Sequence, residues 1–359
     1  MAETEAPPAV PAIAAEDREH DNLVVDPTID DSDSTYGDEL SVYTASVTSS
    51  VTDYQKSVSP QFPLIFSYVV KLFVLTSILG KTVEDTMPTK KDVRYMLPND
   101  EQENERLDMH HALIRVTMKD KLFLAPIGDA PGRVIDICTG TGIWAIEFGY
   151  RKRPQPYPAQ TDRVPPNVKF IIDDVEDEWG YENDPFDFIH ARYLTGGVKN
   201  MPRLLEQAFA CLKPGGWAEF QDWDAMVQSA DGTTKGTSIE RYFTSTLPAF
   251  EMAGYITRPG IYLEKWMKDA GFVNVQVHKH LVPVGTWAKD KHFKTVGAYN
   301  LLQFEESLEG SAVAALTRIG NWSKEEVDIL IAKTKQDARN PKIHSLFHFY
   351  VVYGQKPKN

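Results

Sequence analysis

From about residue 94 onward, short runs of apolar residues alternate with longer stretches in which apolar residues recur every three or four positions. The first pattern is typical of buried strands and the second of amphipathic helices. Strands that alternate with helices predict an α/β fold, mostly parallel, with an antiparallel hairpin at the C-terminus. The predicted strands cover residues 133–140, 168–174, 185–193, 217–224, 273–284 and 347–357, and the predicted helices 142–150, 201–212, 238–250 and 261–272.

The N-terminal sixty residues differ from the rest of the chain in charge. They contain 13 Asp or Glu and two Lys or Arg, whereas the remaining residues are close to neutral. Few large apolar residues accompany these charges, so residues 1–55 are predicted to be a disordered acidic tail. Removing residues 1–50 is accordingly predicted to leave thermal stability unchanged. The nearly neutral body lacks the basic footprint of a nucleic-acid-binding protein, so no direct nucleic-acid binding is expected.

An apolar stretch, Phe62 to Leu79, follows the acidic tail. Its 18 residues reach the lower limit for a membrane-spanning helix, but Lys71 near its centre and Pro63 at its start weaken that interpretation. The alternatives for this stretch are a membrane anchor, a part of the hydrophobic core and an insert that does not belong to the domain. The chain has two cysteines and no apolar secretory leader at its start, so a reducing, cytoplasmic location is expected.

The stretch "DICTGTGIWA" carries the main chemical signal. Gly140 and Gly142, followed by the small Ala145, fit a nucleotide-binding loop between a strand and a helix. Asp136 lies within the preceding strand, where a carboxylate would repel a pyrophosphate. It suits a ligand with an ammonium and a sulfonium group, which describes S-adenosylmethionine. Cys138, at a position where a further glycine is common, is predicted to be a small core residue.

Several motifs in order resemble the fungal LaeA-like methyltransferases, a branch of the class I S-adenosylmethionine-dependent fold. They are "SVYTASVTSSVTDY", "YMLPNDEQENERLDMHH", "DICTGTGIWAIEF", "VPPNVKFIIDDVED", "FDFIHARYL", "LKPGGWAEFQDWD", "YNLLQFEESLEG" and "FHFYVVYGQKP". The resemblance implies a seven-stranded Rossmann-like sheet. It also implies a relation to global regulators of secondary metabolism and to enzymes encoded within metabolite gene clusters.

The resemblance also implies site residues. The cofactor loop would use Asp136, Thr139, Gly140 and Gly142, and the adenine would meet Asp173 and Asp174. The substrate side would include, as catalytic candidates, His190, Arg192 and Asp222, with the neighbouring Trp223. A satisfied surface pair is an equally good interpretation of His190 and Arg192. No metal site is expected, because the histidine pairs lack partner ligands at suitable spacing.

Two segments depart from the family pattern. Residues 151–163 contain three prolines and no Val, Ile or Leu, so they cannot supply the expected second strand, whose final acid binds the ribose. Asp162 stands at the expected spacing, but no strand leads to it. We therefore predict an exon-boundary error there and translated intron within residues 55–92. The chain as written should bind S-adenosylmethionine poorly, and a restored strand ending in Asp should recover binding.

The predicted organisation is a tail at 1–55, an anomalous insert at 56–92 and a methyltransferase domain at 93–359. The leading functional hypothesis is methyl transfer to a small fungal secondary metabolite. The alternative is a LaeA-like regulator that acts through protein partners with little or no methyl transfer. Cytoplasm is the expected location, with the nucleus and membrane anchoring through 62–79 as alternatives.

Overall fold

The computed structural model describes residues 23–27, 101–150, 165, 167–229 and 231–358, together with the backbone of 69–72. The strands are β1 (Val69–Leu72), β2 (Val134–Ile137), β3 (Lys169–Ile172), β4 (Phe186–Arg192), β5 (Leu212–Gln228), β6 (Val273–Pro283) and β7 (Leu346–Gln355). The helices are α2 (Glu101–Thr117), α3 (Ile143–Tyr150), α4 (Met201–Ala210), α5 (Ser238–Met252), the short η2 (Pro259–Ile261), α6 (Leu263–Asp269), α7 (Lys291–Arg318) and α8 (Lys324–Ala338).

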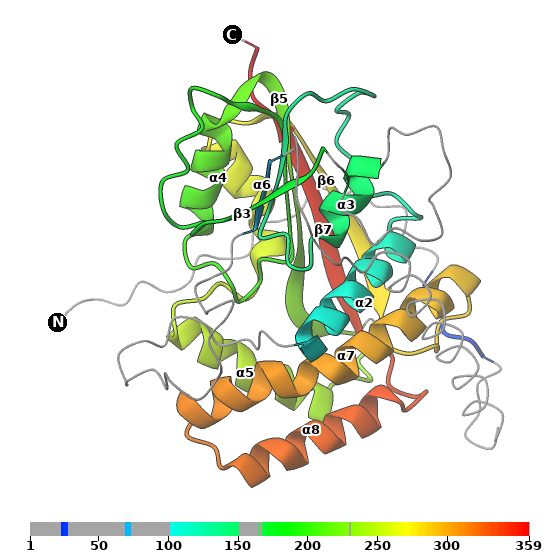
Figure 1. The fold of residues 1–359 in the computed structure, drawn as a ribbon. Helices are drawn as coiled ribbons and strands as arrows, with labels where there is room; N and C mark the ends of the chain where they lie inside the picture. Colours follow the sequence, from blue (N-terminus) through cyan, green and yellow to red (C-terminus); the bar gives the residue numbers. More distant parts are fainter. Residues whose placement is uncertain are drawn as a thin grey trace.

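The described strands form one seven-stranded sheet in the order β3-β1-β2-β4-β5-β7-β6 (Figure 1). Strands β3, β1, β2, β4 and β5 pair in parallel, and β7 runs antiparallel to both of its neighbours. The predicted α/β class, the mostly parallel sheet and the antiparallel C-terminal pair are therefore confirmed. The pair is not a tight hairpin, however, because α7 and α8 lie between β6 and β7 in the chain.

The place beside β2, where the family has its second strand, is occupied by β1. Lys71 pairs with Ile137 of β2, and the four residues of β1 pair in register with the four of β3. Part of the segment that the sequence suggested was foreign to the domain thus bridges β2 and β3. Residues 151–163, including Asp162, lie outside the described part, so the exon-boundary hypothesis stays a prediction that the transcript can test.

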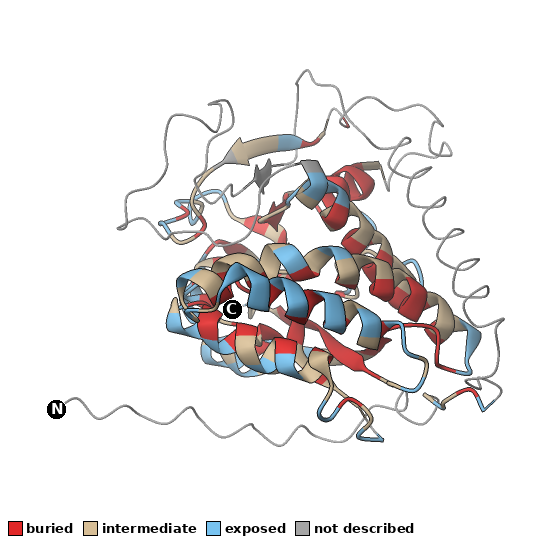
Figure 2. Cartoon of the chain, turned by 90° about the horizontal axis from the view of Figure 1, so that it is seen from below, coloured by how far each residue is buried: buried red, intermediate tan, exposed pale blue. Residues whose placement is uncertain are grey.

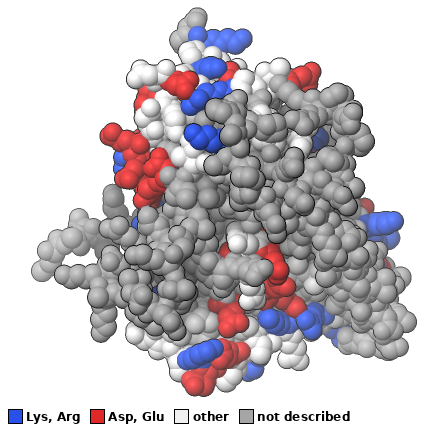
Figure 3. Space-filling view, in the orientation of Figure 1, with Lys and Arg blue, Asp and Glu red and all other residues white. Residues whose placement is uncertain are grey.

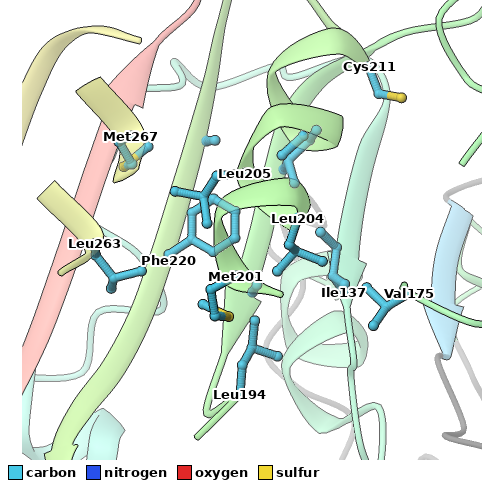
Figure 4. Close-up of a cluster of buried hydrophobic side chains, with 14 of the residues drawn as sticks. Ile137, Val175, Leu194, Met201, Leu204, Leu205, Cys211, Phe220, Leu263 and Met267 are labelled. Carbon is cyan, nitrogen blue, oxygen red and sulfur yellow. The ribbon is translucent and has the colours of Figure 1, made fainter. Parts of the chain in front are cut away.

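One face of the sheet packs on α4 and α6. Figure 4 shows this core, in which side chains from β2, β5 and the two helices meet. Ile137, Leu205 and Phe220 are each at most 1% exposed there. Helix α4 begins at the Asn200 cap with Pro202 in its first turn, and Leu204, Leu205 and Ala208 on one face are buried. This packing fixes the loops that follow β2, β4 and β5.

Helices α5, α7 and α8 lie across the end of the sheet at which β5 finishes (Figure 1). Viewed from below, exposed residues lie on their outward faces and buried residues gather toward the sheet (Figure 2). Helix α2 packs on α7 and touches α3. The hydrophobic pattern did not single out α2, α7 or α8, although these helices shape the end of the sheet where ligands bind in this fold class.

A short piece of the acidic tail is ordered against the domain. Asp26 donates its backbone N–H to the Trp287 carbonyl over 2.9 Å, and its carboxylate pairs with Lys294 at 2.7 Å. Leu23 and Val25 pack on a cluster that includes Trp287. Within the tail that the sequence predicts to be disordered, residues 23–27 are thus placed against the segment around Ala288, with which Val25 forms an antiparallel bridge.

Truncation can measure this docking. Removing residues 1–27 should lower the free energy of unfolding by about 1–3 kcal/mol, since two apolar side chains and one ion pair are lost. Removing residues 1–22 is the matched control and should leave stability unchanged. Urea denaturation of both truncated proteins would measure the difference, and equal stabilities would show that the docked segment contributes nothing.

Charges of both signs are interspersed over the described surface in Figure 3. This agrees with the nearly neutral body that the sequence shows. Among the described helices, none is long and apolar enough to cross a membrane. Within the apolar stretch from Phe62 to Leu79, the structure describes Val69–Leu72, and these residues form a strand.

Candidate active site

The glycine loop connects β2 to α3 in a left-handed conformation. Cys138, Gly140 and Gly142 have φ angles of +54°, +59° and +80°. The N–H of Gly142 donates to the Thr139 carbonyl over 3.0 Å, which closes the turn. For Cys138 this backbone costs about 1–2 kcal/mol, because its Cβ crowds the carbonyl oxygen. Burial raises the pKa of its thiol, so it is no thiolate nucleophile, as the sequence predicted.

The two loop glycines differ in what surrounds them. A Cβ at Gly142 would lie 2.5 Å from the Phe170 ring of β3, whereas one at Gly140 would meet only Leu107 of α2, at 3.4 Å. In the structure Gly142 leaves room for Phe170, which fits α3 closely against the sheet. Its place in the cofactor site stays a prediction.

Asp136 is 3% exposed and forms a pair with His190 on the next strand. The His190 Nδ1–H donates to Asp136 Oδ1 over 2.6 Å, and the imidazole stacks on Trp144 with ring centroids 3.8 Å apart. Burial lowers the pKa of His190, so Asp136 orients a neutral ring. The other Asp136 oxygen has no hydrogen bond to a described residue.

Arg192, also on β4, extends this buried polar network toward α2 and α3. Its guanidinium donates to His111 Nδ1 over 2.6 Å, which leaves the His111 proton on Nε2, 3.3 Å from Glu147. Glu147 also binds Arg115 of α2. Burial lowers the pKa of Arg192 to about 10 and raises that of Glu147 to about 7. His190 and Arg192 are therefore structural members of a network between α2, α3 and the sheet.

A second buried acid lies on β5, on the same face. Glu219 is fully buried and accepts hydrogen bonds from the backbone N–H groups of Leu124 and Ala125 and from the Gln221 amide. Burial raises its pKa from 4.5 to about 7. Because the folded state holds this proton more tightly, the stability from Glu219 is full below about pH 4.5 and is lost as the pH rises through about 7.

Replacing Glu219 by Gln should therefore change the pH dependence of stability. From pH 5 to pH 8 the native protein should lose on the order of 2 kcal/mol relative to Glu219→Gln, which cannot ionise. The buried histidines titrate in both proteins and cancel in the comparison. Denaturation midpoints at a series of pH values give the difference, and parallel curves would contradict the shifted pKa.

Asp173 and Asp174 follow β3 in a turn at its carboxyl end. The Asp173 carboxylate accepts from the Asp174 N–H, and the Asp174 carboxylate accepts from the Glu176 N–H, both over 2.9 Å. Both residues are partly exposed. Their place at the edge where the glycine loop also lies is compatible with the predicted adenine contact, which stays a prediction.

Asp222 is buried and its carboxylate binds protein groups. It is 2% exposed and accepts from the N–H groups of Leu194 and Trp223 and from the Thr195 hydroxyl. These bonds hold the loop after β4 to β5. The role of Asp222 on the substrate side stays a prediction.

A cavity of about 130 Å³ lies at the carboxyl end of β4 and along the last part of β5. Its walls come from α2, α5, α7, β5, β7 and the segments that follow β4 and α5, and they are rich in aromatic rings. The aromatic side chains are Tyr193, Trp223, Tyr242, Phe243, Phe250, Phe304 and Phe347, joined by His110. His190, Arg192 and Asp222 do not line it, but Tyr193 and Trp223, one residue further along each strand, do. Trp223, named from the sequence, thus lines the cavity, and the catalytic roles of His190, Arg192 and Asp222 stay predictions.

The glycine loop fits S-adenosylmethionine on observations that are independent of its motif. Thr139 Oγ1 is buried without a hydrogen-bond partner among the described residues, and Asp136 has one carboxylate oxygen unused by them. The Gly140 backbone is open, because a Cβ built there would meet only Leu107 Cδ1, at 3.4 Å. A hydroxyl and a carboxylate at a loop that precedes a helix suit the ammonium and hydroxyl groups of such a ligand.

Comparison with known proteins decides the family. A sequence model of the methyltransferase domain matches residues 109–277. Methyltransferase pytC of Aspergillus terreus is 38% identical over 271 residues, which cover 73% of this chain and 83% of pytC. This chain is a class I S-adenosylmethionine-dependent methyltransferase of the LaeA-like family. Its cofactor is S-adenosylmethionine.

Further relatives of this methyltransferase include both enzymes and regulators. The probable methyltransferase tdiE of Emericella nidulans is 33% identical, over 71% of this chain and 82% of tdiE. The secondary metabolism regulator laeA of Aspergillus flavus is 31% identical, over 74% of each chain. Among solved structures, phosphoethanolamine N-methyltransferase 2 of Haemonchus contortus is a distant likeness, with 13% identity, a TM-score of 0.34, and 86% of this chain and 57% of that chain covered.

Sequence reasoning missed the part of the methyltransferase that surrounds the cavity. His110, Gln303 and Phe304 come from α2 and α7, which the hydrophobic pattern did not predict. The described residues contain no cluster of His, Cys, Asp or Glu that could hold a metal ion. The substrate-side signal available in the sequence was the density of aromatic residues in "SIERYFTSTLPAF", now in α5, which supplies four residues of the wall besides Thr246.

Proposed function

We propose that this protein transfers the methyl group of S-adenosylmethionine to a small, apolar secondary metabolite. The observation that carries this proposal is the aromatic cavity at the edge of the sheet where the glycine loop also lies. The described residues that line it include no Asp, Glu, Lys or Arg. An apolar molecule that enters the cavity therefore strips no water from charged side chains among them. The relatives pytC and tdiE, named as methyltransferases, support the proposal.

In this proposal the chain acts by alignment and by exclusion of water, which is most of what methyl transfer requires. When bound, S-adenosylmethionine supplies an electrophilic methyl group on a sulfonium. Asp136 would face its positive charge, Thr139 and the Gly140 backbone would hold its polar groups, and Asp173 and Asp174 would meet the adenine. The aromatic walls would keep water away from the acceptor atom.

Binding of the cofactor is the first test. Purified protein titrated with S-adenosylmethionine in a calorimeter should bind one equivalent, with heat that saturates. Because the sequence of residues 151–163 offers no strand that ends in a ribose-binding acid, the affinity should be roughly tenfold to over a hundredfold lower than in a chain whose second strand is restored with a terminal Asp. Absence of any binding by either chain would overturn the proposal.

The alternative function is a regulator that acts through protein partners with little or no methyl transfer. The identity to laeA, named as a regulator, favours it. Release of S-adenosylhomocysteine with an extract of small metabolites, but not with protein fractions, would support the enzyme. Binding of the cofactor without turnover on any metabolite would support the regulator.

We propose a cytoplasmic location, with the nucleus as the location under the regulator alternative. Two cysteines that form no disulfide, Cys138 and Cys211, are compatible with a reducing compartment. Fractionation of cells that produce the tagged full chain distinguishes these locations, and recovery in the membrane fraction after a carbonate wash would contradict both.

A further inference from the structure

The cavity wall offers few hydrogen-bond donors to a substrate, because most of its hydroxyl groups donate to the protein. The hydroxyl of Tyr242, for example, donates to the Leu308 carbonyl over 2.7 Å, and that of Thr246 to the Tyr242 carbonyl over 2.8 Å. The same holds for Thr195, Thr257 and Ser307. A substrate therefore meets a wall whose hydroxyl groups have little left to donate.

Two adjacent rings carry donors that no described residue accepts from. Tyr193 Oη accepts from Arg106 Nη1 at 3.5 Å, so its own proton is directed away from that arginine. His110 Nε2 accepts from Trp223 Nε1 over 3.0 Å, which places the His110 proton on Nδ1. Neither proton is donated to a described residue. The two rings are stacked, with centroids 4.2 Å apart, so both donors belong to one part of the wall.

Among the described residues of the wall, none could remove a proton. They include no carboxylate, and burial lowers the pKa of His110 well below its usual range while its Nε2 is occupied by Trp223. An acceptor that is methylated here must lose its proton without help from these residues. A phenol or enol, with a pKa of about 10 or lower, can do so near neutral pH, whereas an aliphatic alcohol, with a pKa close to that of water, cannot.

We propose, on the basis of the methyltransferase function proposed above, that the cavity takes a flat, uncharged substrate with a phenol or enol hydroxyl. Tyr193 Oη and His110 Nδ1 donate to the oxygen of that hydroxyl as it ionises. Arg106, held by Glu103 at 2.6 and 2.7 Å, lies behind Tyr193 and strengthens the tyrosine as a donor. Both donors then stabilise the negative charge that the oxygen gains when it ionises, and so lower the pKa of the bound hydroxyl.

The reaction balances with these groups alone. The acceptor oxygen first releases its proton to solvent and keeps the electron pair. It then forms a C–O bond to the methyl carbon, while the C–S bond breaks and its electron pair goes to the sulfur, so that the sulfonium becomes a neutral thioether. No oxidant, metal or enzyme base takes part.

Two bicyclic probes of similar shape test the proposal. 2-Naphthol ionises as a phenol, whereas 2-naphthalenemethanol has an alcohol that does not. At about pH 9, where a phenol begins to ionise, the full-length protein should bind 2-naphthol at least tenfold more tightly. With S-adenosylmethionine present, 2-naphthol should release S-adenosylhomocysteine and 2-naphthalenemethanol should not.

Tyr193→Phe should reduce the preference for 2-naphthol over 2-naphthalenemethanol about tenfold. Titration of the variant with each probe gives this preference as a ratio of Kd values. Tyr242→Phe is the matched control, because it also removes a hydroxyl from the wall but one that already donates to the backbone. It should change the ratio less than twofold. Three results would overturn this inference but not the proposed function. The protein could bind S-adenosylmethionine but neither probe, it could bind both probes equally, or the two variants could change the ratio alike. Failure to bind S-adenosylmethionine would overturn the proposed function instead.

Discussion

A methyl group added at Gly142 is expected to destabilise the protein by about 2–5 kcal/mol. Part of this cost, about 1–2 kcal/mol, is the left-handed backbone at φ +80°, which a side chain tolerates poorly. The rest, about 1–3 kcal/mol, comes from overpacking, because the new Cβ would lie 2.5 Å from the Phe170 ring. Urea denaturation of Gly142→Ala measures the sum.

Gly140→Ala separates the two contributions. Gly140 has a similar φ of +59°, but its Cβ would meet only Leu107 at 3.4 Å. Gly140→Ala should therefore lower the free energy of unfolding by the backbone contribution alone. Combining Gly142→Ala with Phe170→Leu should recover part of the excess, since a smaller side chain can move aside. Equal losses for the two alanine variants would show that Phe170 yields freely and that the glycine serves another purpose.

The strands and the loop were predictable because their causes are local. A buried parallel strand leaves a short, largely aliphatic run, as in the Val-Ile-Asp-Ile of β2, and a loop with φ above zero favours glycine. Helix α8 was missed although Ser323 and Glu326 form a capping box, because its exposed face dilutes the apolar periodicity. The placement of β1 between β2 and β3 depends on pairing across more than sixty residues, which no local pattern encodes.

The residues that line the aromatic cavity were hard to predict for a related reason. Alternate residues of a strand face opposite sides of the sheet, and the first residues after the strand follow neither side. His190 and Arg192 thus point into the buried network, while Tyr193, with its left-handed φ of +60°, turns toward the cavity. Its partner His110 comes from α2, far away in sequence, so the pair becomes visible only once the chain is folded.

Asp136→Ala is expected to cost about 3–5 kcal/mol of stability in addition to cofactor binding. A carboxylate that served the ligand alone could be removed without harm to the fold. The structure shows that it also receives the His190 Nδ1–H at 2.6 Å in a buried network shared with Arg192. Removal of one partner from such a network leaves the others unpaired, which is the costly way to break it. Loss of binding by Asp136→Ala would therefore be ambiguous.

Asp136→Asn resolves the ambiguity, because its amide oxygen can still accept from His190 while the charge is gone. Its stability should fall by at most about 1.5 kcal/mol, the value of an ordinary hydrogen bond. Its affinity for S-adenosylmethionine should still fall at least tenfold if the carboxylate faces the cationic ligand, since a charge-assisted contact is worth about 1.5–3 kcal/mol. S-adenosylhomocysteine lacks the sulfonium charge but keeps the ammonium, so its affinity should fall less on this substitution. A folded Asp136→Asn protein that binds both ligands as the native protein does would confine Asp136 to orienting His190.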